Sequence, residues 1–179
     1  MKNNMKQSMA VKTGMISRRH QRSRKEESEF GLAEKEFILC SECESVYFDK
    51  SWHNRLEEEK IQHLKTDRQV KFELCPVCKM AHDKLFEGEL VVKLKSQNAK
   101  IKIKEEILNT IKNSDKQARE RDPMDRILWT EEREDGIHIF TSENQLAVRI
   151  GKKLKSSFPG STLEIKHSGE DVIRVYWEV

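Results

Sequence analysis

The most regular alternation of apolar and polar residues lies in the last third of the chain. Two short segments with β-prone apolar residues, 126–133 and 137–141, flank the dipeptide Asp135-Gly136. This dipeptide accepts the positive backbone angles of a type I′ turn, which joins the strands of many two-residue hairpins. The pattern therefore predicts a β-hairpin over residues 126–141.

A helix and a second hairpin are predicted to follow. Apolar residues recur at helical spacing over residues 143–157, a segment that Thr141 or Ser142 can cap and that Pro159-Gly160 closes. The expected order of elements in this part of the chain is β-β-α-β-β. Its last two strands are predicted at 163–167 and 172–177.

The predicted helix has an apolar face and a basic flank. Four apolar residues fall within one third of its circumference and are expected to face the sheet: Leu146, Ala147, Ile150 and Leu154. Cations near the C-terminal end of a helix stabilise it through the helix dipole, but the same side chains can also bind phosphates. Both interpretations apply to the flank, which is formed by Arg149, Lys152 and Lys153.

The pattern before this module is weaker. Residues 80–86 predict a short helical turn, and residues 89–95 contain a β-prone apolar run. Strict alternation of lysine and isoleucine over residues 100–104 permits an edge strand with its lysines in solvent. We expect a helix from there to about Arg119, and the polar stretch that ends at Asp122-Pro123 predicts a boundary between domains.

Two further elements are expected upstream. Ser51 can cap a helix that runs from Trp52 to about Lys65 and has an acidic outer face. Residues 69–74 alternate apolar and polar side chains, so they predict a strand that leads into Cys75.

Four cysteines carry the chemistry of this region. They form two C-x-x-C pairs, Cys40 with Cys43 and Cys75 with Cys78. Each pair has the spacing of a metal-binding knuckle, and together they supply the four thiolates of a closed tetrahedral zinc site. Disulfides are the alternative, whereas a redox centre of the thioredoxin type needs one pair in a βαβ setting. We predict a structural zinc ion, because four thiolates leave no position for a catalytic water.

The gap between the two pairs is long. Residues 44–74 separate them, 31 residues in all, whereas simple two-knuckle ribbons have about 15 to 20. The helix and the strand predicted in the gap account for its length. His53, His63 and His82 are close enough in sequence to act as ligands, but the four cysteines complete the site, so we interpret these histidines as surface or packing residues.

Charge separates the start of the chain from the rest. The chain has 34 basic and 31 acidic residues, and residues 1–25 contain eight of the basic ones and no acidic one. Residues 26–179 therefore have 26 basic and 31 acidic side chains, a balance of −5. Residues 1–29 have few apolar groups, so we expect a disordered arm that binds phosphates, with a solubilising tail as the alternative. The arm residues expected to bind are Arg18, Arg19, Arg22, Arg24 and Lys25.

Composition excludes several classes of protein. No apolar run approaches the roughly 20 residues of a membrane span, and the N-terminus lacks the apolar centre of a secretory signal. We expect a cytoplasmic protein with reduced thiols, whose translation starts at Met1 or Met15. The chain lacks a phosphate-binding glycine loop and the motifs of zinc proteases and serine hydrolases, so we expect neither an enzyme nor a small-molecule substrate.

These patterns together predict an α+β protein with three parts. Residues 1–29 form the basic arm. Residues 30–122 form a zinc-ribbon-like module with a helix-strand insertion and a trailing helix. Residues 123–179 form the β-β-α-β-β module.

One run of residues resembles a known family. Residues 127–142 (ILWTEEREDGIHIFTS) follow a knuckle pair and a helix, and precede Gln145-Leu146-Ala147 and Gly151-Lys152-Lys153-Leu154. This order resembles the N-terminal region of the ribosomal large-subunit export adaptor of archaea and eukaryotes, the nonsense-mediated decay protein three family. It also resembles small, uncharacterised bacterial zinc-knuckle proteins that have a basic start and two C-x-x-C pairs.

The resemblance implies zinc ligation by the four cysteines and attachment to the large ribosomal subunit or its RNA. It does not imply transport, because the chain lacks the adaptor's additional cysteines, later domains and export signals. The leading hypothesis is a non-enzymatic, zinc-stabilised protein that binds the large ribosomal subunit or structured RNA. The alternatives are a DNA-binding or transcription-associated zinc ribbon and a protein-interaction adaptor, which the acidic balance of residues 26–179 favours slightly.

Overall fold

The larger of two β-sheets combines strands from distant parts of the sequence. In the computed structural model, which describes residues 37–48, 50–54, 70–94, 100–167 and 171–179, this sheet has five strands in the order β6-β7-β5-β9-β8. Strand β5 is antiparallel to β7 and parallel to β9, while β6-β7 and β8-β9 are antiparallel pairs. The strands are β5 (Gly88–Lys93), β6 (Ile127–Arg133), β7 (Gly136–Thr141), β8 (Thr162–His167) and β9 (Ile173–Glu178).

Strand β5 lies at the centre of this sheet, and its apolar run Leu90-Val91-Val92 places buried side chains on both faces. Leu90, Val91 and Val92 are each at most 2% exposed, and a run of this kind needs neighbours on both sides and cover on both faces. From the sequence, these residues are expected in the zinc module, before the boundary predicted at Asp122-Pro123. The sheet thus includes a strand from each side of that boundary.

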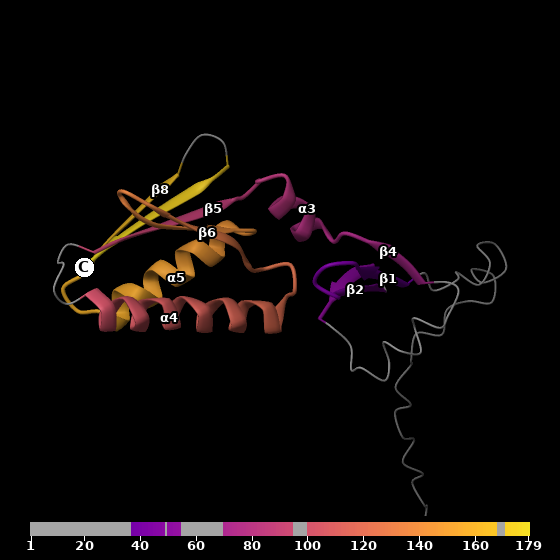
Figure 1. Cartoon of the computed structure of the whole chain (residues 1–179), viewed down its shortest axis with the longest axis horizontal. Coiled ribbons are helices and arrows are strands. Elements are labelled where there is room, and N and C mark those ends of the chain that lie inside the picture. Colours follow the sequence, from indigo (N-terminus) through magenta and orange to yellow (C-terminus); the bar gives the residue numbers. More distant parts are fainter. Residues whose placement is uncertain (1–36, 49, 55–69, 95–99, 168–170) are drawn as a thin grey trace, which may run out of the picture. The chain divides into compact units, whose positions relative to one another are not determined.

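Helices α4 (Lys100–Arg121) and α5 (Asn144–Ser157) lie along one face of the five-stranded sheet (Figure 1). The four apolar residues predicted on the inner face of α5 are buried, at no more than 1% exposed. Together with the inward side chains of β5, β7 and β9 they form the main core, which includes Leu90, Val92, Ile107, Ile111, Ile137, Ile139, Leu146, Ala147, Ile150, Leu154, Val175 and Trp177.

The predicted hairpins are present, but the first turn differs in detail. Arg133 pairs with Gly136, so the two central residues are Glu134 and Asp135 and the glycine begins β7. Gly136 has φ of 145°, and a Cβ atom there would lie 2.4 Å from Val92 O. The glycine is needed for close approach to β5, and the predicted type I′ turn at Asp135-Gly136 is wrong.

The cap predicted for α5 is also different. Glu143 occupies the N-cap position and makes no side-chain capping bond. Thr141 Oγ1 donates instead to Gly88 O and to Glu143 O, and Ser142 Oγ donates to Met124 O. The two hydroxyl groups therefore fix neighbouring backbone segments rather than the first turn of the helix.

The edge strand predicted at residues 100–104 is wrong, because this segment is the first turn of α4. Ile103 packs against the core, and Ile107 and Ile111 are 0% and 4% exposed. The apolar residues recur every four positions from Ile103 onward, which is helical spacing. The short alternation before them fits both periods, so it could not decide between strand and helix.

A second, smaller sheet carries the first cysteines. It has the order β3-β2-β1-β4, with β1 antiparallel to β2 and parallel to β4. The strand predicted before Cys75 is present as β4. The helical turn expected at residues 80–86 is displaced, because the helix is α3 (Pro76–His82), which starts directly after Cys75 and includes Cys78. The strands are β1 (Phe37–Cys40), β2 (Val46–Phe48), β3 (Ser51–His53) and β4 (Val70–Glu73).

The helix predicted to begin at Trp52 is wrong at its start. Ser51–His53 is strand β3, in which Trp52 pairs with Tyr47 and the two rings lie 5.4 Å apart. This contact and the pairing with β2 hold the segment extended, and the capping signal at Ser51 does not reveal either of them. The rest of the predicted helix, residues 55–65, lies outside the described residues.

Candidate metal centre

The four cysteines are presented by two different local structures. Cys40 ends β1 and Cys43 lies in the following turn, which closes with hydrogen bonds from Cys40 N to Ser45 O and from Glu44 N to Cys40 O. Cys75 is the N-cap residue of α3, where its sulfur accepts a hydrogen bond from Cys78 N. Pro76, the next residue, suits the first turn of a helix because it needs no amide donor there.

The sulfur atoms of the four cysteines lie within 4.8 Å of one another. Cys40 Sγ is 3.7 Å from Cys78 Sγ, and Cys43 Sγ is 3.6 Å from Cys75 Sγ. A tetrahedral ion with metal–sulfur bonds of about 2.3 Å requires sulfur separations of about 3.8 Å. The four residues named from the sequence therefore form a cluster that fits a metal ion.

The cysteines are free, so the cluster contains no disulfide. Three of them are buried, at most 4% exposed, and only Cys43 is partly exposed. Apolar side chains surround the sulfurs: Val77 is buried with them, and Trp52, Leu74, Met124 and Leu128 pack around the cluster. This shell keeps water away from most of the centre, as expected for a structural site.

Hydrogen-bond donors point at the sulfurs from several directions. Cys75 N donates to Cys40 Sγ at 3.3 Å, and Cys78 N donates to Cys75 Sγ at 3.4 Å. Cys43 Sγ itself donates to Ser45 Oγ at 3.2 Å, so this hydroxyl is a partner of the thiol and is not one of these donors. Donors of this kind stabilise thiolates, which is the form that binds a metal.

The strongest of these donors was not found from the sequence. The guanidinium of Arg126 donates to Cys78 Sγ at 3.0 Å and to Cys75 Sγ at 3.6 Å. Arg126 is 48 residues from Cys78 in the chain, and its sequence neighbours form no metal-binding motif. Its one sequence signal is a single arginine immediately before the apolar start of a predicted strand.

The short distances between the sulfurs also shift the pKa values of the thiols in different directions. The pKa of Cys43 lies well below its usual range because Cys75 donates a hydrogen bond to it, and the pKa of Cys75 rises correspondingly. Burial raises the pKa of Cys78, against the lowering effect of Arg126. Thiols this close share protons, and a bound metal ion would deprotonate them together.

The histidines considered as additional ligands have other roles. The ring of His53 stacks on Phe48, with centroids 3.9 Å apart, and its Nε2 lies 2.9 Å from Ser51 Oγ. His82 Nε2 lies 2.5 Å from Glu42 Oε1 at the surface. His63 lies outside the described residues.

The predicted phosphate-binding residues are described only in part. Arg149, Lys152 and Lys153 are exposed on α5, and the guanidinium of Arg149 forms an ion pair with Asp125. The helix thus presents two lysines beside an arginine whose charge is partly neutralised. The arm residues, Arg18, Arg19, Arg22, Arg24 and Lys25, lie outside the described residues.

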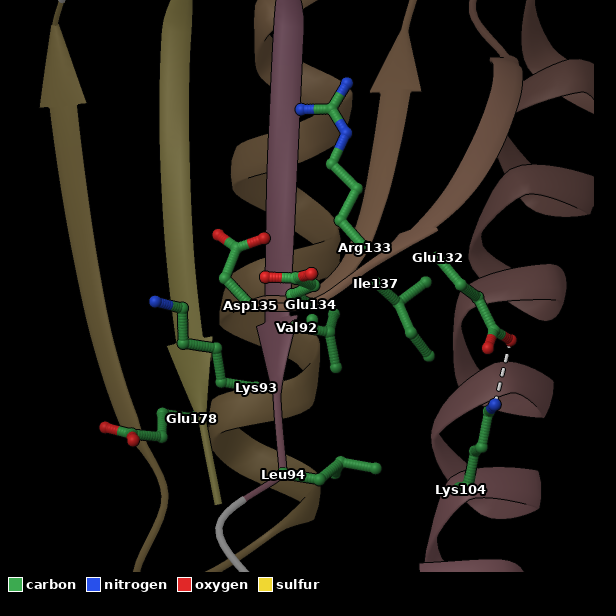
Figure 2. A pocket seen from close by; sticks show the side chains of 11 residues that line it. Val92, Lys93, Leu94, Lys104, Glu132, Arg133, Glu134, Asp135, Ile137 and Glu178 are labelled. Atoms are coloured by element: carbon green, nitrogen blue, oxygen red, sulfur yellow. Dashed lines mark hydrogen bonds and ion pairs between the residues drawn. The ribbon is translucent and has the colours of Figure 1, made fainter.

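A cavity of about 400 Å³ lies at the turn of the first hairpin, between the end of β5 and α4 (Figure 2). Its apolar wall includes Val92, Leu94 and Ile137, and its rim carries both signs of charge. Lys104 Nζ donates to Glu132 Oε1 at 2.8 Å across this rim. The cavity contains none of the residues predicted to bind metal or nucleic acid.

A buried polar chain crosses the sheet face opposite the two helices. His138 Nδ1 lies 2.8 Å from Glu89 Oε1, and His138 Nε2 lies 2.9 Å from Asp135 Oδ1. Glu89 Oε2 accepts a hydrogen bond from Arg174 Nε at 2.9 Å. Both nitrogens of the histidine face carboxylates, so in this arrangement neither is directed toward a substrate.

Comparison with known proteins does not identify a family. No family model matches the sequence, and no curated protein matches it. No described helix combines the length and the apolar character needed to cross a lipid bilayer. The cysteine cluster is therefore the feature from which a function has to be argued.

Proposed function

We propose that this is a non-enzymatic, zinc-binding protein of the cytoplasm that binds structured RNA, with the large ribosomal subunit as its expected target. The observation that carries the zinc proposal is the set of four cysteine sulfurs within 4.8 Å of one another. Thiolates select soft or borderline ions, whereas magnesium and calcium prefer oxygen ligands. Among such ions, zinc in a closed tetrahedron of four thiolates is the usual structural metal.

The role of the zinc ion is to hold the fold of its own region. Four thiolates leave no open position for water or substrate, so the metal would not act as a Lewis acid. It would instead join the turn after β1 to the start of α3, two segments separated by residues 44–74. A cross-link of this length stabilises a region that has few buried apolar side chains.

The RNA proposal rests on the distribution of basic residues. Residues 1–25 contain eight lysines and arginines and no acidic residue, and Lys152 and Lys153 are exposed on α5. Such groups neutralise phosphates and bind without reading bases. RNA helices are recognised mainly through shape and backbone, which suits this arrangement. The likeness of residues 127–142 to the ribosomal export adaptor makes the large subunit the first target to test.

A second candidate, a protein-interaction adaptor, is favoured by the sheet face opposite α4 and α5. Its basic side chains pair with acidic neighbours: Arg133 with Glu131, Arg174 with Glu89, and Lys166 with Glu164. Such paired charges attract phosphates weakly, because each cation already has an anionic partner. A partner on this face is therefore better matched by a protein than by a nucleic acid.

Co-sedimentation with purified ribosomal subunits at low and high salt tests the RNA proposal. We expect the full chain to migrate with the large subunit at low salt and to dissociate as salt rises, since phosphate contacts release counterions. Deletion of residues 1–25 should weaken binding most, and the double change Lys152→Gln/Lys153→Gln should weaken it less. Lys112→Gln, an exposed lysine of α4, is the matched control.

The other outcomes distinguish the alternatives. Stronger competition by duplex DNA than by ribosomal RNA would favour a DNA-binding zinc ribbon. Failure to bind either nucleic acid at low salt would contradict the RNA proposal and leave the adaptor hypothesis. Binding that the deletion leaves unchanged would exclude the basic residues 1–25 from the interface.

A further inference from the structure

Arg126 is fixed at the beginning of the five-stranded sheet, although its side chain reaches the cysteines. Its amide donates to Ser142 Oγ at 2.9 Å, and its carbonyl accepts a hydrogen bond from Ser142 N at 3.0 Å. Ser142 links the end of β7 to the start of α5, because Thr141 ends the strand and Asn144 begins the helix. The backbone of Arg126 is therefore held by elements of the main core.

The side chain of Arg126 is almost completely buried against the cysteine cluster. The residue is 8% exposed, and its guanidinium donates to Cys78 Sγ and Cys75 Sγ. Met124 and Leu128, two residues away on either side, pack against the same cluster. One short segment thus supplies both a cation and apolar cover to the metal centre.

The charge of a zinc–tetrathiolate centre gives this contact its significance. One divalent cation and four thiolates sum to two negative charges, and buried charge is costly unless it is paired and hydrogen-bonded. An arginine remains protonated under all ordinary conditions, and its planar group can donate to two acceptors at once. Arg126 meets both requirements at the two thiolates that α3 supplies.

We propose that Arg126 is the positioning residue that couples metal binding to the folding of β6 and the start of α5. Occupation of the site by zinc increases the negative charge that holds the guanidinium, and this tightens the segment from Met124 to Leu128. Loss of zinc weakens that hold and loosens the same segment. The inference rests on the zinc part of the proposed function and is independent of RNA binding.

Zinc affinity gives the first test, measured by competition with a chromophoric chelator. Arg126→Gln removes the charge, and we expect zinc affinity to fall by about 10- to 100-fold, the usual effect of losing a group that supports metal ligands. Arg133→Gln is the matched control, because Arg133 ends β6, the strand that follows Arg126, and pairs with Glu131 at the surface. The control should leave zinc affinity unchanged.

A spectroscopic test separates this role from a general loss of stability. In the cobalt-substituted protein, the thiolate-to-metal absorption band reports the electron density on sulfur. Removal of the donor to Cys78 Sγ should shift this band to longer wavelength in Arg126→Gln and leave it unchanged in Arg133→Gln. If Arg126→Gln does not fold, Arg126→Lys can be used instead. It keeps the positive charge but lacks the planar guanidinium that donates to two sulfurs, and it should show a smaller shift in the same direction.

Amide hydrogen exchange with and without zinc tests the coupling itself. In the wild type, zinc should slow exchange over residues 124–128 as well as around the cysteines, and in the folded Arg126 variant it should slow exchange around the cysteines alone. Equal zinc affinity, band position and exchange in wild type and variant would overturn the inference while leaving the zinc site intact. Absence of zinc binding by the wild type would overturn this inference together with the zinc part of the proposed function.

Discussion

The two sheets of this protein are stabilised in different ways. In the cysteine region, defined as residues 37–48, 50–54 and 70–82, the buried cluster around the sulfurs consists of three cysteines and Val77. In the sheet region, defined as residues 88–94, 100–167 and 171–179, fully buried side chains such as Leu90, Ile150 and Trp177 form a continuous core between a sheet and two helices. One region has four ligands that can hold a cross-linking metal ion, and the other has a large buried apolar area.

The difference indicates how each region should respond to change. A small region cannot bury enough apolar surface to offset the entropy of folding, and a metal ion is a common substitute. The sheet region needs no such ion, because burial of apolar groups contributes about 25 cal/mol per Å². Removal of metal should therefore affect the cysteine region and the adjoining residues 124–128, whereas truncation of the core should affect the sheet region.

The largest effect is expected from Cys75→Ser. Structural zinc contributes about 10 to 16 kcal/mol of apparent folding energy in small peptides, so loss of one thiolate should unfold most of the cysteine region. Exchange of amide hydrogens should become fast over residues 37–48, 50–54 and 70–82, while the central strands of the sheet region remain protected. Ser41→Ala, at an exposed position in the turn between Cys40 and Cys43, is the control, and full protection in Cys75→Ser would contradict the comparison.

Truncation of a side chain in the main core should destabilise the sheet region and leave the metal centre unchanged. Ile150 is 0% exposed on the inner face of α5, so Ile150→Ala should lower the free energy of unfolding by about 2 to 5 kcal/mol. Ile150→Val, which removes one methyl group, should cost about 0.5 to 1.5 kcal/mol. Chemical denaturation measures both changes, and zinc content should stay at the wild-type value; its loss would show that the two regions are not distinct.

A backbone change at the first hairpin should have a moderate effect. Gly136→Ala forces a side chain into a positive φ and against Val92 O, 2.4 Å from the new Cβ. We expect a loss of about 1 to 3 kcal/mol in chemical denaturation, the range for one strained residue. Gly160→Ala is the matched control, because that glycine also has positive φ but has nothing within 4 Å. An equal loss at both positions would show that close approach to β5 is unimportant.

The smallest effect is expected at Asp135, and it depends on pH. The hydrogen bond with His138 holds the pKa of this carboxyl below its ordinary value of 3.8. The unfolded chain therefore binds the proton more tightly, so the carboxylate stabilises the folded state above pH 3.8 and loses this effect as pH falls through the lower folded pKa. Asp135→Asn should reduce stability at neutral pH but not in strong acid, as measured by denaturation at both.

Glu134→Gln, one residue away in the same turn, is the control for Asp135→Asn. It removes a carboxylate without touching the contact with His138. A loss of stability in Asp135→Asn that persists unchanged in strong acid would show that the contact acts through shape rather than charge.

Several parts of this structure were predictable because their signals are local. The spacing within each C-x-x-C pair named all four sulfurs of the cluster, and the inner face of α5 was read correctly from Leu146 to Leu154. Both hairpins of the larger sheet were also predicted. In each case the residues that determine the structure lie within a few positions of one another.

Two of the misses, at β5 and at Arg126, have a common physical cause, which is a partner distant in the sequence. Strand β5 joins the larger sheet because β7 and β9 lie on either side of it. Arg126 could not be assigned to the cysteine cluster, since the chain gives no sign that it folds back to Cys78. Local patterns identify elements and ligands, but not which elements pair or which side chain supports a ligand.

Native mass spectrometry of the purified full chain tests the central claim most directly. The account predicts one zinc ion per chain, with the four thiols protected from alkylation until a chelator removes the metal, and no bound zinc in Cys75→Ser. A wild-type chain that carries no metal under reducing conditions, with all four thiols open to alkylation, would contradict it.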